Sequence, residues 1–139
     1  MRYILFFLFF ASANIVIGQQ ESLNLKISNI QEAKGQIIVS IFKNATDFPV
    51  AGKEFKKVII DVENIPAESQ SIHLPKGEYA IALLHDENED GECNYNMIGI
   101  PKEGYGFSQN FKPLFSIPSF DDTKFELDGD QTMVINLIH

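Results

Sequence analysis

Side-chain oxygens recur at alternate positions in the segment DENEDGECNYN, which spans residues 86–96 of this 139-residue sequence. Asp86, Asn88 and Asp90 are followed by Gly91, which tolerates the positive φ of a sharp bend. Calcium takes about six to eight hard oxygen ligands, and alternate residues of a tight loop can point at one centre. The spacing therefore predicts a calcium site in this segment.

Other oxygens could complete the calcium shell, namely the carbonyl of residue 92 and the side chain of Asn94 or Asn96. The pattern matches the first half of an EF-hand loop, but Met97 stands where that loop has a bidentate glutamate. We therefore expect a site of modest affinity in a β-loop. The alternative is a solvated acidic loop whose Asp and Asn side chains hydrogen-bond to their own backbone.

His85 precedes Asp86, and a His–Asp pair can act as a general base. The sequence contains no accompanying nucleophile motif, because Ser108 lacks an elbow sequence and Cys93 has no second histidine nearby. We expect the His85 ring to pack and to hydrogen-bond to loop backbone, which would orient Asp86. The role of Cys93 stays open.

Aromatic side chains follow the acidic segment, and exposed aromatic rings can stack on a sugar or contact a peptide. The opposing interpretation is a small local core with phenylalanines packed beneath the loop. Tyr95 and Tyr105, together with His85, are the candidate ligand contacts. The aromatic set is Tyr95, Tyr105, Phe107, Phe111, Phe115 and Phe120.

These residues must be positioned by short strands, because glycine and proline interrupt the sequence at intervals and the runs between them are rich in β-branched and aromatic residues. The most apolar run, 79–84, predicts a central strand that is buried on both faces. Residues 85–122 are long and irregular, which is unusual in a small domain unless the segment is functional or braced. The predicted strands are 23–27, 36–42, 55–62, 69–74, 79–84, 124–127 and 132–138.

The pattern predicts an all-β fold, a single mostly antiparallel β-sandwich of about seven or eight strands with a long irregular loop region. A short connection between strands 23–27 and 36–42 favours a hairpin. The net charge of −8 disfavours a nucleic-acid partner, since phosphates would be repelled. The single cysteine, Cys93, excludes an intramolecular disulfide.

The N-terminal segment has the layout of a secretory signal peptide: Arg2, then an unbroken apolar run over residues 4–10, then the small residue Gly18 before polar sequence. We expect cleavage after Gly18, with residues 11–13 as a second candidate site. An uncleaved anchor is the alternative, but the apolar run is shorter than the ~20 residues that span a bilayer. The expected mature chain, 19–139, is one domain without a transmembrane segment.

Several segments resemble the DUF2141 family of exported bacterial proteins. The most specific are HDENEDG at 85–91 and GIPKEGYGFSQN at 99–110, supported by GQIIVSIF at 35–42, DFP at 47–49, LPKGEYA at 74–80 and PSFDD at 118–122. The resemblance implies a prealbumin-like or immunoglobulin-like sandwich and no established activity. Many relatives carry aspartate where Asn94 stands, so the loop has one charge fewer here.

From these observations we expect a periplasmic or secreted, non-enzymatic binding or structural module of unknown role, with calcium stabilising the 86–96 loop. Its partner would be a protein or a saccharide. One alternative is a small periplasmic hydrolase or other enzyme that uses His85 and Asp86 beside an aromatic groove. Another is a partner-binding subunit of an envelope assembly.

Overall fold

The computed structural model describes residues 18–65, 70–114 and 116–139, so the predicted signal peptide lies outside the described residues except for Gly18. The described chain is built from short strands and single helical turns. Its elements are β1 (Gln20–Ser28), β2 (Gln36–Phe42), β3 (Lys56–Asp61), η1 (Val62–Asn64), β4 (Gln70–Pro75), β5 (Gly77–Asp86), β6 (Tyr105–Phe107), η2 (Ser108–Asn110), α1 (Phe120–Thr123), β7 (Phe125–Leu127) and β8 (Gln131–Asn136).

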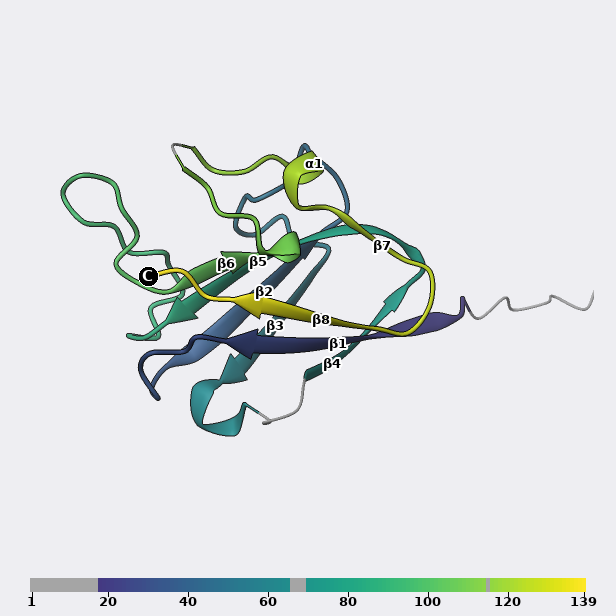
Figure 1. The fold of residues 1–139 in the computed structure, drawn as a ribbon, viewed down its shortest axis with the longest axis horizontal. Coiled ribbons are helices and arrows are strands. Elements are labelled where there is room, and N and C mark those ends of the chain that lie inside the picture. Colours follow the sequence, from purple (N-terminus) through teal and green to yellow (C-terminus); the bar gives the residue numbers. More distant parts are fainter. Residues whose placement is uncertain (1–17, 66–69, 115) are drawn as a thin grey trace, which may run out of the picture.

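Two packed sheets form the molecule, which confirms the predicted β-sandwich (Figure 1). One sheet has the order β4-β1-β8, and the other has the order β3-β2-β5-β6 with β7 paired to the first residues of β5. The pairs are antiparallel apart from β1 and β8, which run parallel. Within the described residues no helix is both long and apolar enough to cross a membrane.

The main core lies between the sheets and follows from period-two patterning. Leu23 and Leu25 of β1 are fully buried while Asn24 between them is partly exposed, because successive side chains of a strand point to opposite faces. Each such leucine contributes about 1.5–3 kcal/mol by leaving water. The buried members of this core are Leu23, Leu25, Ile37, Val39, Ile41, Ile60, Val62, Ile72, Leu74, Tyr79, Ile81, Leu83, Phe125, Leu127, Ile135 and Leu137.

A second core covers the outer face of the larger sheet, and it explains why β5 is buried on both sides as predicted. Tyr79 and Ile81 point into the main core, whereas Ala80 packs with Phe42, Phe48 and Phe120. The Phe48 ring meets Phe42 edge-on, with 5.3 Å between centroids. The loop after β2 and the turn α1 are thereby held on the sheet.

The predicted hairpin between the first two strands is wrong. β1 pairs with β4 and β8, and β2 pairs with β3 and β5, so the connection 29–35 crosses from one sheet to the other. Both strands have an apolar face. The two faces pack against each other across the sandwich, so the two strands belong to different sheets. Gly35 at the end of this connection has φ 74°, and a Cβ there would lie 2.3 Å from the Asp86 carbonyl oxygen.

The irregular region 85–122 is braced by elements that its sequence pattern did not reveal. β6 pairs with β5 at Tyr105↔Leu84, and η2 follows it directly. α1 begins with a capping box in which the Ser119 hydroxyl accepts from the Asp122 N–H while the Asp122 carboxylate accepts from the Ser119 N–H. The longest described stretch without a strand or helix leads from β5 to β6.

Candidate functional site

The predicted site lies in the loop between Asp86 at the end of β5 and Tyr105 at the start of β6, which projects from the sandwich near the C-terminus (Figure 1). Its outer part is a small hairpin, since the Asn96 N–H donates to the Ile100 carbonyl at 2.8 Å and the Lys102 N–H to the Asn94 carbonyl at 2.8 Å. At its base the His85 N–H donates to the Gly104 carbonyl at 2.7 Å. The loop is therefore an ordered extension of the sheet.

Asp86 organises the start of this loop from a fully buried position. One carboxylate oxygen accepts from the Asp90 N–H at 3.2 Å, and the other accepts from the Gly91 N–H at 2.9 Å and from Gln36 Nε2 at 2.8 Å. Backbone N–H groups that converge on a carboxylate stabilise its charged form. Both oxygens thus face N–H donors. Asp86 therefore holds the bend of the loop, whereas the sequence predicted that it would be a calcium ligand.

Glu103 performs the matching task at the end of the loop, and it was not among the residues predicted to form the site. Its buried carboxylate accepts from the Glu87 N–H at 3.1 Å and from the Asn94 N–H at 3.2 Å. The two loop ends are therefore tied through one side chain. One sequence signal could have identified Glu103. It lies in the GIPKEGYGF segment, which is the most specific part of the family resemblance after the acidic run.

Asn88, Asp90 and Asn94 come together on the exposed side of the loop. Both amide nitrogens donate to the same Asp90 oxygen, each at 2.9 Å, and the Glu92 N–H donates to the other at 2.8 Å. These hydrogen bonds hold the pKa of Asp90 below its usual range, and the bond from Asn94 has the largest effect. The Asn94 amide nitrogen also lies 3.3 Å from Glu103, so it connects two carboxylates.

Three of the five predicted calcium ligands therefore share one centre, and two do not. Asp86 faces the loop backbone, and Asn96 closes a separate turn by accepting from the Ile98 and Ile100 N–H groups at 3.0 and 2.9 Å. Across the described ranges no three His, Cys, Asp or Glu side chains are grouped as metal ligands would be. The shared centre consists of one carboxylate and two amides.

His85 is fully buried beneath the loop. Its Nε2 lies 2.9 Å from the Lys34 carbonyl, which makes this nitrogen the donor, and its Nδ1 has no hydrogen-bond partner within the described structure. The Ser108 hydroxyl is also buried, accepting from the Ile81 N–H at 2.9 Å and donating to the Thr123 carbonyl at 2.5 Å. The His85 ring is packed and hydrogen-bonds to loop backbone as expected, but the backbone belongs to the 29–35 connection and not to the 86–96 loop.

Comparison with known families fits this arrangement of strands and loop. A family model described as "Uncharacterized protein conserved in bacteria (DUF2141)" matches residues 25–135. The chain belongs to the DUF2141 family. The match runs from β1 into β8 and contains the whole loop, which confirms the resemblance seen in the sequence. No curated protein and no solved structure matches the chain.

The aromatic set of this DUF2141 protein separates into different environments. Phe120 is buried in the second core, and Phe107 packs against it from a partly buried position, as the local-core interpretation predicts. Tyr105 stacks edge-on with Phe107, with 6.1 Å between centroids, and is partly buried. Tyr95 is exposed on the hairpin, where a hydrogen bond with the Cys93 side chain raises its pKa. Phe115 lies outside the described residues.

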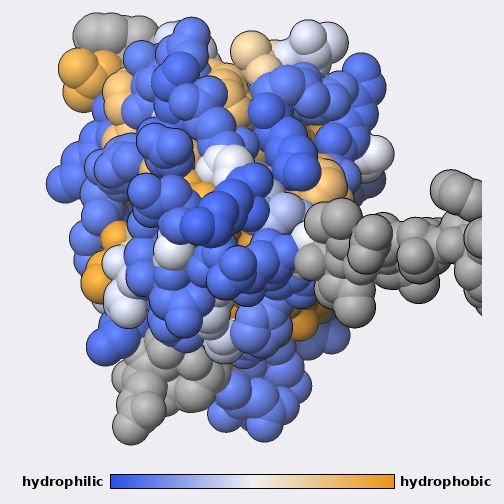
Figure 2. All heavy atoms as spheres, turned by 90° about the vertical axis from the view of Figure 1, so that its right-hand side faces the viewer, coloured by the Kyte–Doolittle hydropathy of each residue, from blue (hydrophilic) through white to orange (hydrophobic). Residues whose placement is uncertain are grey.

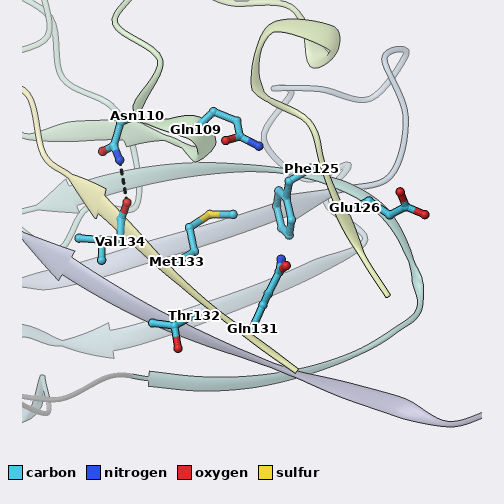
Figure 3. A pocket seen from close by; sticks show the side chains of 8 residues that line it. All are labelled: Gln109, Asn110, Phe125, Glu126, Gln131, Thr132, Met133 and Val134. Atoms are coloured by element: carbon cyan, nitrogen blue, oxygen red, sulfur yellow. Dashed lines mark hydrogen bonds between the residues drawn. The ribbon is translucent and has the colours of Figure 1, made fainter. Parts of the chain in front are cut away.

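A groove elsewhere on the DUF2141 fold contains none of the predicted site residues (Figure 3). It lies between β7 and β8, beside η2, and Asn110 crosses one end by donating to the Val134 carbonyl at 2.8 Å. Both polar and apolar side chains line it, with Glu126 as the single charge. The lining residues are Gln109, Asn110, Phe125, Glu126, Gln131, Thr132, Met133 and Val134.

Proposed function

We propose that this DUF2141 protein is an exported, non-catalytic module that binds or supports a partner through the loop between β5 and β6. The observation that carries the proposal is the use of the buried carboxylates Asp86 and Glu103. Both bond to backbone N–H groups of the loop and so maintain its shape. A loop held in one conformation loses little entropy on association, which suits a binding surface.

The hydrolase alternative has less support from the geometry. A general base must reach a substrate proton within hydrogen-bond distance. The His85 ring is fully buried with one nitrogen against the Lys34 carbonyl, and Asp86 beside it is equally buried. The export signal in residues 1–18 remains part of the proposal and points to a periplasmic or secreted protein.

The proposal includes a calcium site with fewer ligands than the sequence predicted. Asn88, Asp90 and Asn94 would supply one oxygen each if the two amides rotated by half a turn, because their Nδ2 atoms now face the Asp90 carboxylate. The cation would replace the amide hydrogens between Asp90 and Glu103. Rotating the amides breaks the bond that Asn88 Oδ1 accepts from the Asp90 N–H, so affinity would be modest.

Thermal unfolding with calcium and with a chelator tests this site. A tenfold excess over Kd stabilises the native state by roughly 1.4 kcal/mol, which raises Tm by several degrees. Asp90→Ala should remove the calcium effect, and Asn94→Asp should enlarge it by adding a carboxylate beside Asp90 and Glu103. Glu126→Ala, on β7 at the far end of β5, should keep the wild-type response. The calcium site would be excluded if each of the four proteins, wild type and the three variants, had the same Tm in calcium as in chelator.

A further inference from the structure

The tip of the hairpin, residues 95–100, exposes a concentration of apolar side chains. Tyr95, Met97, Ile98 and Ile100 are 53%, 104%, 79% and 51% exposed. They are four of the ten large apolar side chains that are exposed in the described part of the chain. Single exposed apolar residues are ordinary, but a contiguous exposed group marks an interaction site.

The tip presents these side chains on an ordered backbone. The Gly99 N–H donates to the Asn96 carbonyl at 3.0 Å, and the Asn96 side chain accepts from the N–H groups of Ile98 and Ile100. Gly99 has φ 81°, and a Cβ there would meet no atom within 4 Å, so the turn is tight without being packed against the body. The hairpin keeps its apolar residues away from the two cores.

An acidic collar lies at the base of the tip, on the segment that leads into it. Residues 87–94 contain four acidic residues and no basic one, and Lys102 is the one basic residue between the tip and β6. Lys34 pairs with Glu87 at 3.1 Å, whereas Glu89, Asp90 and Glu92 are exposed to solvent. An apolar centre inside a charged rim is the usual composition of a protein–protein interface.

The charge of the collar decides among the surfaces that could cover the tip. A second copy would bring the same acidic collar and a net charge of −8, so like charges would oppose each other. An anionic membrane would repel the collar, since membrane-binding segments of this kind are basic. A protein with an apolar pocket and a basic rim satisfies both the tip and the collar.

We propose that the 95–100 tip inserts into an apolar pocket, rimmed by lysine or arginine, on a partner protein. This inference rests on the proposed binding function and names the surface and the partner chemistry. Figure 2 shows the opposite end of the sandwich as mainly hydrophilic over the described residues visible there, with apolar residues in small separate areas. Insertion of Met97 and Ile98 would supply the affinity, and the collar would supply orientation and speed of association.

Site-specific photocrosslinking in cells that make the full chain tests the proposal. Benzoylphenylalanine in place of Met97 should yield one protein adduct, which is lost when Ile98→Asp is added. The control is Ile59, a 56% exposed residue on β3, where the probe should give no such adduct. The adduct protein is then purified and its affinity measured. Ile98→Asp should weaken binding at least about tenfold, and Ile59→Asp should leave it unchanged.

Charge is tested with the same purified pair. Glu89→Gln with Glu92→Gln should weaken binding several-fold and flatten its salt dependence.

Three outcomes would overturn the proposal: adducts only with lipid or with a second copy, no adduct at Met97, or equal affinity of the Ile98→Asp and Ile59→Asp variants. A partner that binds both variants equally would leave the binding function standing while removing the tip from it. If probes at Met97, Ile59 and Tyr105 all capture nothing, the binding function itself fails.

Discussion

At the scale of residues, the main feature is two buried carboxylates that serve a loop backbone. Asp86 and Glu103 accept their hydrogen bonds from N–H groups, and neither has a salt-bridge partner among the described residues. Several N–H dipoles aimed at a carboxylate compensate the cost of its burial. The acidic run that suggests a metal site is thus partly a structural device, and Asp90 is one of its exposed members.

Asp86→Ala should lower the free energy of unfolding by about 2–3 kcal/mol, because two backbone N–H groups and the Gln36 amide lose their acceptor. Urea unfolding measures the change. Glu32→Ala removes an exposed carboxylate from the 29–35 connection and should change the value by less than about 0.5 kcal/mol. If both variants unfold at the same urea concentration, Asp86 does not hold the loop.

At the scale of elements, α1 shows how one capped turn attaches a long segment to a sheet. Its four residues begin at the Ser119 cap and bring Phe120 into the second core, 6.1 Å from the Phe48 ring. A helix this short has little stability of its own, so the cap and the buried ring must hold it. The second core therefore depends on the local capping signal.

Acid should weaken this turn. Hydrogen bonds from the Ser119 hydroxyl and then from its N–H hold the pKa of Asp122 below its usual value of 3.8. A lowered folded-state pKa stabilises the native state above the unfolded value, and that contribution is lost as pH falls through the folded value. The stability difference between wild type and Asp122→Asn should therefore be constant from pH 7 to 5 and shrink below about pH 4. Urea unfolding across this range measures it, and a gap that persists at pH 2 would contradict the role of the carboxylate.

At the scale of the whole molecule, the two sheets are joined along β8 by a side chain that imitates a strand. Asn110 donates to the Val134 carbonyl at 2.8 Å (Figure 3). It also accepts from the Asn136 N–H at 2.8 Å, as a neighbouring peptide group would. It does so from φ 52°, and Gln109 before it has φ 61°. Non-glycine residues in this region are strained, and here the strain positions an amide on an open sheet edge.

Removing that amide should expose the edge of β8. We expect Asn110→Ala and Asn110→Gly both to associate with rising concentration, because each frees the Val134 carbonyl and the Asn136 N–H. Glycine relieves the positive φ, so it separates loss of the amide from backbone strain. Analytical ultracentrifugation measures the association. Two variants that stay as monodisperse as wild type would show that Asn110 does not protect the edge.

Sequence periodicity alone located the strands apart from β6, and it also located the loop. Alternation such as that of Leu23 and Leu25 is a local property of extended chain, so the strands were recognisable, as was the both-faces burial of β5. The run after β5 was equally visible as the segment that no periodic pattern could absorb.

Strand pairing and the direction of the loop carboxylates, in contrast, depend on tertiary contacts. β1 pairs in parallel with β8, more than a hundred residues away, and no nearby pattern encodes that choice. Asp86 turns toward backbone N–H groups because burial at the end of β5 demands donors, and Glu103 meets Asn94 only once β6 has joined the sheet. Side-chain types report what chemistry a residue can do, whereas packing sets which partner it finds.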